Sequence, residues 1–195
     1  MFSSAHPDIT VELIPGNHEE LYQLLRRGLV NLVLNDQRRV FSEEYINVIL
    51  ASVGCWVEIS AISPMAGLPS VTPQEMKNTP CILVSSPSQQ DTERTYYHDI
   101  VGFHGEFLFA ENLDDARLLV IGGRGFLPAE GGSSEVDCSC AIRRIPLHRD
   151  NAQMTRNYCA FWRKDNAGLF AKEFCEILRQ QFVSEQLINE SRKSN

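Results

Sequence analysis

One stretch of the sequence decides the fold: residues 6–35, which read HPDITVELIPGNHEELYQLLRRGLVNLVLN. Its first part, residues 8–14, alternates apolar and polar side chains, and this period of two predicts a half-buried strand. Asn17 follows as a candidate helix N-cap, and Glu20 stands three residues later, as in a capping box. The pattern therefore predicts a strand followed by a capped helix.

A second strand is predicted directly after this helix. Gly28 ends the helix, and residues 29–34 are short, apolar and β-prone, which is typical of a buried strand. A strand, a helix and a strand in succession predict a parallel sheet with a right-handed crossover. Ligands of open α/β sheets bind beyond the carboxyl ends of the strands, and here that end carries residues 35–38.

The rest of the chain continues the alternation of strands and helices. Residues 46–59 are β-rich, and the turn-rich residues 60–69 predict a crossing into a second lobe. Further strands are predicted over residues 81–85, 106–109, 126–127, 141–147 and 158–163, and helices over residues 88–98, 113–121 and 166–182. The predicted fold class is α/β, in two lobes.

Composition and charge narrow the classes of partner. The 195 residues are 43% hydrophobic and 22% charged, the balance of an ordinary globular protein. The net charge is −7, and because non-specific DNA affinity comes from Lys and Arg neutralising phosphates, the chain alone is expected to repel DNA. Three scattered basic pairs are interpreted as solvated surface charge: Arg26–Arg27, Arg38–Arg39 and Arg143–Arg144.

The sequence offers no clear sign of export, membrane insertion or metal binding. Its apolar runs are shorter than the roughly 20 residues of a membrane span, and no secretory signal opens it, so we expect a cytoplasmic protein without a membrane partner. The six cysteines are expected to be reduced thiols. Cys138 and Cys140, with His148 downstream, leave a metal or redox role open, but a closed zinc site usually needs a second pair of ligands. We predict neither a metal nor a cofactor.

Five segments resemble, in order and spacing, the effector-binding domain of LysR-type transcriptional regulators. The opening stretch shares the small turn, the capped helix and a strand entered through a Gly-x-x-Asn element at residues 28–31. The other four are Ser63–Ala66, Thr79–Ile82, Val120–Pro128 and Phe161–Asp165. Each motif is weak alone, but together they cover nearly the whole chain.

The resemblance implies two Rossmann-like lobes joined by two crossing strands, as in type II periplasmic binding proteins. Residues 1–62 and 153–195 would form lobe I, and residues 63–152 lobe II. It further implies an effector held in the interlobe cleft, hinge closure on binding, and homodimers or higher homo-oligomers. DNA would be bound only through an N-terminal winged helix-turn-helix module, which the sequence lacks, together with the family's first strand and most of its first helix. Either the sequence is an excised part of a longer regulator, or the natural chain is truncated, and in the second case the first sheet would need pairing from another chain.

Candidate effector-binding residues follow from strand ends, helix starts and the crossing strand. Most have a structural alternative: a helix cap, a tight turn, a hinge or solvated charge. In lobe I and the crossing segment they are Asn17, Asn35, Arg38, Ile62 and Ser63. In lobe II they are Ser85, Ser86, Ser88, Arg124 and Phe126.

Two other function classes stay open beside the regulatory sensor. A transporter's solute-binding protein would share the fold, although it would carry a signal peptide. A small α/β enzyme would need a nucleophile with a partnered base or paired carboxylates, and no such motif occurs, so we predict no catalytic residue. The sequence identifies neither the effector nor whether the regulator activates or represses transcription.

Overall fold

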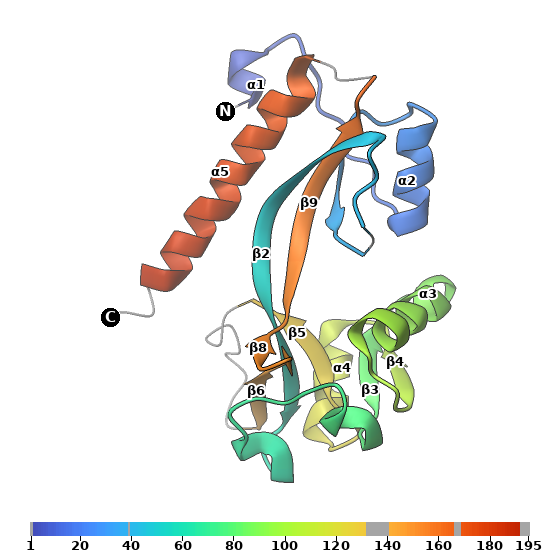
Figure 1. The fold of residues 1–195 in the computed structure, drawn as a ribbon, viewed down its shortest axis with the longest axis vertical. Coiled ribbons are helices and arrows are strands. Elements are labelled where there is room, and N and C mark those ends of the chain that lie inside the picture. The colour runs from blue at the N-terminus through green and yellow to red at the C-terminus, as the bar shows by residue number, and fades with distance from the viewer. Residues whose placement is uncertain (1, 39, 132–140, 166–168, 192–195) are drawn as a thin grey trace. The chain divides into compact units, whose positions relative to one another are not determined.

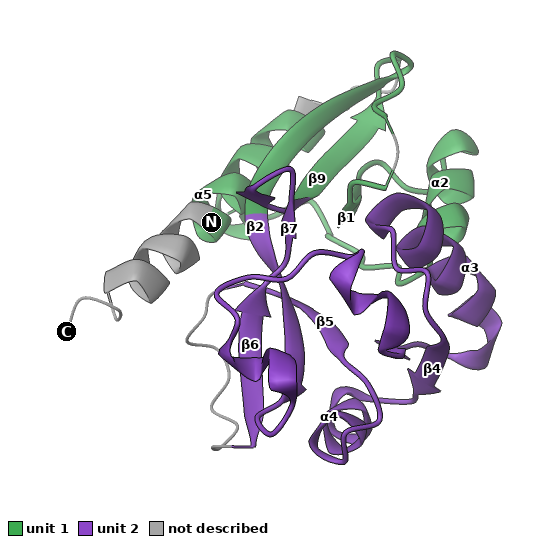
Figure 2. Ribbon diagram, turned by 60° about the horizontal axis from the view of Figure 1, so that its bottom comes forward, with its two compact units in different colours: residues 1–52, 157–195 green, residues 53–156 purple. Residues whose placement is uncertain are grey.

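The computed structural model describes residues 2–38, 40–131, 141–165 and 169–191, and it divides the chain into two compact units. Unit 1 comprises residues 1–52 and 157–195, and unit 2 comprises residues 53–156 (Figure 2). The chain passes between them twice, along β2 (Tyr45–Ser60) and β9 (Thr155–Arg163). From the sequence, the lobe boundaries were expected at 62/63 and 152/153, and this assignment of lobes stays a prediction. The two compact units of the structure divide at 52/53, within β2, and at 156/157, within β9.

Unit 1 combines a small antiparallel sheet with three helices: α1 (Phe2–Ala5), α2 (His18–Arg26) and α5 (Leu169–Ser191) (Figure 1). Strand β1 (Val33–Asp36) pairs antiparallel with β9, so that Val33 lies opposite Phe161. Helix α2 has the predicted capping box and ends before Gly28, whose φ of 69° lies in the left-handed region. The prediction of this helix is confirmed.

The predicted strand over residues 8–14 is wrong in this structure. The segment belongs to no strand, because no strand lies beside it among the described residues and a strand requires a hydrogen-bonded neighbour. The predicted parallel strand-helix-strand unit fails with it. The strand expected over residues 29–34 instead begins at Val33 and runs to Asp36.

Unit 2 contains a parallel pair of strands, β3 (Cys81–Val84) and β4 (Phe107–Ala110), in register from Cys81 opposite Phe107. The helices of this unit are α3 (Gln90–Thr95), its π-helical continuation η4 (Tyr96–Val101), α4 (Leu113–Ile121) and the 3-10 turns η1 (Pro64–Gly67), η2 (Glu75–Asn78) and η3 (Pro87–Gln89). The predictions of β2, β3, β4 and α4 are confirmed.

An antiparallel group of strands completes unit 2. Strands β5 (Leu127–Glu130) and β6 (Ile142–Pro146) both pair with the second half of β2, and β7 (His148–Arg149) pairs with β8 (Ala152–Gln153). The core between these elements includes Phe103 and Phe126, whose ring centroids are 4.8 Å apart. Both rings are almost fully buried, so they stabilise the unit by excluding water.

Candidate functional site

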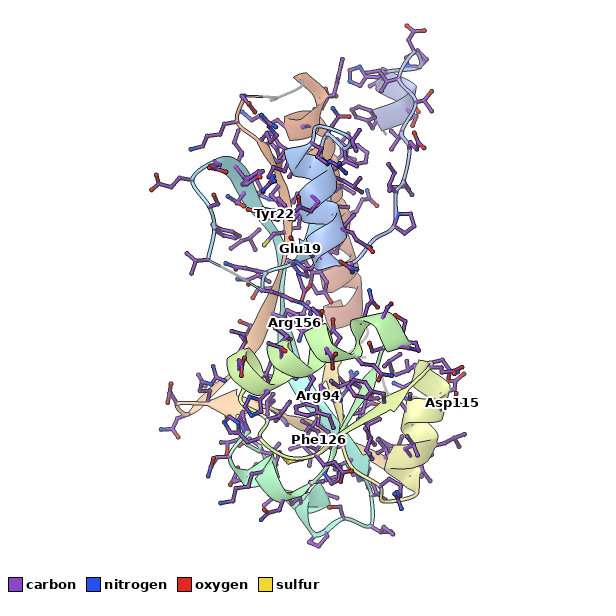
Figure 3. The ribbon with its side chains drawn as sticks, turned by 90° about the vertical axis from the view of Figure 1, so that its right-hand side faces the viewer. Glu19, Tyr22, Arg94, Asp115, Phe126 and Arg156 are labelled. Carbon is purple, nitrogen blue, oxygen red and sulfur yellow. The ribbon has the colours of Figure 1, made fainter. Side chains whose placement is uncertain are left out.

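A pocket of about 70 Å³ lies in unit 1 where β1 ends beside α2; we call it the unit 1 pocket. Its lining includes His18, Tyr22, Asp36, Arg38, Phe41 and Cys159. Tyr22 projects from α2 (Figure 3), and its ring centroid lies 5.8 Å from that of Phe161 on β9. The pocket therefore offers aromatic walls with charged groups at the strand end.

The charged groups of the unit 1 pocket form one hydrogen-bonded cluster. Arg38 Nε donates to both carboxylate oxygens of Asp36, at 3.3 and 3.0 Å, and His18 Nε2 lies 3.0 Å from Asp36 Oδ1. The side chain of Asp36 is 9% exposed and that of Arg38 is 17% exposed. The guanidinium predicted to bind a ligand carboxylate is thus already oriented by a carboxylate of the chain itself.

The two asparagines predicted for unit 1 make local hydrogen bonds. Asn17 Oδ1 accepts from the Glu20 backbone N–H at 3.0 Å, and Glu20 Oε2 accepts from the Asn17 N–H at 2.8 Å. Asn35 Oδ1 accepts from the Asp36 N–H at 2.9 Å. Asn35 lies within β1 and not after it. Asn17 caps α2, and the first residue of that helix, His18, lines the pocket.

A second pocket, of about 270 Å³, lies in unit 2 at the carboxyl end of β3; we call it the unit 2 pocket. Its lining includes Leu83, Val84, Glu93, Tyr97, Leu113 and Pro128. Burial raises the pKa of the Tyr97 hydroxyl to about 12, so this group is a neutral hydrogen-bonding group at neutral pH.

Arg156 holds one side of the unit 2 pocket through its contact with Tyr97. Its Nη2 donates to the Tyr97 hydroxyl at 3.3 Å, and its Nη1 lies 2.5 Å from Glu130 Oε1. The guanidinium also lies 5.1 Å from the ring centroid of Tyr96 (Figure 3 labels Arg156). An ion pair and two aromatic contacts therefore fix this cation near the start of β9.

The structure brings the three predicted serines of unit 2 together at the end of β3. Ser85 is 7% exposed, and its Oγ donates to the Ser86 carbonyl at 3.1 Å. The Oγ atoms of Ser86 and Ser88 are 3.2 Å apart. The strand residue Val84, which lines the unit 2 pocket, comes directly before them.

The remaining predicted residues lie away from both pocket linings. Phe126 is completely buried in the core of unit 2, and Arg124 is exposed in the turn after α4. Ile62 is 90% exposed and follows the end of β2, while Ser63 Oγ accepts from the Met65 N–H at 3.3 Å and caps η1. Ile62 and Ser63 therefore do not lie on the crossing strand itself.

Several pocket residues had not been predicted from the sequence. In unit 1 they include His18, Tyr22 and Asp36, and in unit 2 they include Glu93 and Tyr97. A signal did exist for Asp36, a charged last residue of an apolar strand. The aromatic residues carried none, since the pockets that they line depend on tertiary packing.

Comparison with known proteins identifies the family. The model of the LysR substrate binding domain matches residues 1–183. The chain belongs to this family. As a LysR substrate-binding domain it has the fold of type II periplasmic binding proteins. The family assignment favours ligand sensing in transcription regulation over delivery of a solute to a transporter. The family is one of regulator domains and not of enzymes.

Solved structures agree with this assignment at the level of the fold. The regulatory domain of MetR from N. meningitidis has a TM-score of 0.75 at 14% identity, with 94% of this chain and 84% of that chain covered. The reduced OxyR regulatory domain from Pseudomonas aeruginosa has a TM-score of 0.68 at 12% identity, covering 93% and 86%. The effector binding domain of a BenM variant has a TM-score of 0.71 at 14% identity, covering 95% and 86%.

The LysR domain spans 61% of a full-length OxyR variant from Pseudomonas aeruginosa, with which it shares 15% identity at a TM-score of 0.65. No curated protein matches its sequence.

Metal binding and membrane insertion find no support in the described part of the chain. No group of three His, Cys, Asp or Glu side chains suited to a metal ion occurs among the described residues. Cys138 and Cys140, considered for such a role, lie outside them. No helix among the described residues is long and apolar enough to cross a bilayer.

Proposed function

We propose that the domain binds a small organic effector. The candidate contacts in unit 1 are Asn17, His18 and Arg38, and those in unit 2 are the hydroxyl groups of Ser85, Ser86 and Ser88. The observation that carries the proposal is the ordered Arg38–Asp36–His18 cluster beside an aromatic-walled pocket, in a chain of a ligand-sensing family. A cation held in place before binding loses little entropy when a ligand arrives.

The chemistry of the unit 1 pocket favours an effector with an apolar body and one anionic or carbonyl group. Tyr22, Phe41 and Phe161 supply the apolar surface of the unit 1 pocket. The polar side of this pocket is the hydrogen-bonded group of Asp36, Arg38 and His18. The Arg38 guanidinium is the group to which a carboxylate or carbonyl oxygen of the effector would bind.

In a full regulator the domain would act on transcription through its effect on DNA binding. We infer that effector binding shifts the equilibrium between conformations of the domain and that a DNA-binding module joined to it responds. We further propose that the regulator is a homodimer or higher homo-oligomer, that it is located in the cytoplasm, and that it does not turn the effector over. The net charge of −7 supports this division of roles, since a negatively charged domain is repelled by DNA phosphates and another module would make the DNA contacts.

The test is a thermal-shift screen of small carboxylates and aromatic metabolites, followed by calorimetric titration of any hit. Asn17→Ala and Asn112→Ala are a matched pair, since each removes a side-chain acceptor that caps a nine-residue helix. We expect both variants to lose similar stability but only Asn17→Ala to weaken effector binding. Equal binding by both variants would remove Asn17 from the site.

A second pair tests the cluster directly. Arg38→Gln is expected to abolish binding of a carboxylate effector, whereas Arg143→Gln, at an exposed site on β6, is expected to leave it unchanged. If no compound of either class raises the melting temperature of the wild type, the proposal fails. Conversion of a hit to product by the wild type would instead point to an enzyme.

A further inference from the structure

The unit 1 pocket is too small to enclose a whole effector. Its volume of about 70 Å³ compares with roughly 300 Å³ for the smaller pockets that bury an organic ligand. The hydrogen-bonded group of Asp36, Arg38 and His18 lies on its polar side. When a carboxylate or carbonyl group binds beside Arg38, the larger, apolar part of the effector must therefore lie outside the pocket, against the residues at its edge.

Val40 and Phe41 are the apolar residues at this edge. Both line the unit 1 pocket, yet the Val40 side chain is 93% exposed and that of Phe41 is 38% exposed. They follow one another on the segment that joins β1 to β2. Because each side chain borders the pocket and also reaches into water, a ligand that extends out of the pocket would cover apolar surface that water now contacts.

Hydrogen bonds hold the segment that carries these two residues on both sides. Before them, Arg38 Nε donates to the Asp36 carboxylate at 3.0 Å. After them, the Ser42 carbonyl accepts from Asn47 Nδ2 at 3.2 Å and from the Tyr45 N–H at 3.3 Å. The two apolar side chains are thus kept beside the pocket by the fold, which reduces the entropy lost when an effector covers them.

We propose that Val40 and Phe41 determine the specificity of the LysR domain for the apolar part of its effector. The inference rests on the proposed function, in which Arg38 binds the anionic or carbonyl group. The class of effector that fits both regions is a monocarboxylate whose apolar tail extends several carbons beyond the carboxyl group. A short carboxylate stays within the pocket, whereas each CH₂ group of a longer tail covers more of Val40 and Phe41. A fully buried CH₂ group strengthens binding about fourfold.

The experiment is a chemical-shift titration of the 195-residue chain with butanoate, hexanoate and octanoate. We expect the wild-type dissociation constant to fall at least about twofold with each added CH₂ group, since the tail is partly covered. We expect Val40→Ser to bind octanoate at least about fivefold more weakly than the wild type, and butanoate with less than about a twofold change, because only the longer tail reaches this residue.

Leu118→Ser is the matched control. Leu118, on α4 in unit 2, is 65% exposed and lines neither the unit 1 nor the unit 2 pocket, so this substitution also replaces a water-exposed apolar side chain. We expect Leu118→Ser to bind all three carboxylates as the wild type does. The exposure of Val40 means that Val40→Ser should not alter folding, and equal melting temperatures of the two variants and the wild type check this.

Failure of this inference and failure of the proposed function give different results. If octanoate binds Val40→Ser as tightly as the wild type while Arg38→Gln abolishes its binding, the specificity role of Val40 is wrong and the role of Arg38 stands. If none of the three carboxylates binds the wild type, or if Arg38→Gln binds them unchanged, the proposed role of Arg38 is wrong and the specificity role fails with it.

Discussion

Glu58 provides the sharpest prediction on stability, since it joins three elements of unit 2. The side chain lies on β2 and is 1% exposed. Arg117, on α4, donates to both carboxylate oxygens at 2.9 Å, and Arg144, on β6, donates to Oε1 at 3.3 Å. The carboxylate thereby ties α4 and β6 to a strand that continues into unit 1.

Glu58→Gln keeps the shape of this side chain but removes its charge. Arg144 is 7% exposed and cannot turn out to water, whereas Arg117, at 20%, can do so in part. Removing one partner of a buried ion pair costs about 3 to 5 kcal/mol, because the remaining charge stays buried without its counterion. We therefore expect Glu58→Gln to lower the free energy of unfolding by ~3 to 5 kcal/mol.

The assay is urea unfolding of the wild type, Glu58→Gln and the control Glu43→Gln, an exposed carboxylate that precedes β2. The control is expected to change the free energy of unfolding by less than about 0.5 kcal/mol. A loss that small for Glu58→Gln as well would refute the reasoning, since it would mean that water reaches the two arginines in the folded protein.

Three further predictions concern single groups. Asn17→Ala should cost ~1 kcal/mol in urea unfolding because the capping bonds of α2 are lost, and an unchanged stability would contradict this. Burial raises the pKa of Tyr97 from 10.0 to about 12, so the unfolded chain ionises first and the stability that this group contributes is lost as pH rises from about 10 to 12. Tyr97→Phe should reduce this loss of stability. The absorbance titration of the wild type minus that of the variant should have its midpoint near pH 12 and not near pH 10. Burial raises the pKa of the Cys81 thiol well above its usual range, so iodoacetamide should label Cys81 only in denaturant, and labelling in the folded protein would refute that burial.

Local signals predicted the elements whose causes are local. The cap of α2 depends on Asn17 and Glu20, three residues apart, and both hydrogen bonds form. The segment 8–14 has an equally clear pattern but forms no strand, because pairing requires a second segment from elsewhere. Sequence periodicity shows that a segment is able to form a strand, but it forms one only where another strand lies beside it to accept its hydrogen bonds.

Arg124 and Phe126 were proposed from a glycine-containing segment, and in this fold the glycine between them has a structural reason. Gly125 is needed because a Cβ there would overlap the Pro80 carbonyl oxygen, which accepts a hydrogen bond from the Phe126 N–H at 2.9 Å. The close approach is thus between two parts of the chain, and Phe126 packs in the core. Similarly, the pairing of Arg38 with Asp36 and His18 depends on how α2 packs beside β1.

The central claim, that this domain senses a small effector through the Arg38–Asp36–His18 cluster of unit 1, is tested most directly by a crystal structure of protein purified from cells and soaked with a hit from the screen. The account predicts ligand density in contact with Arg38. Density confined to other residues, or a unit 1 pocket filled by the protein's own side chains, would contradict it.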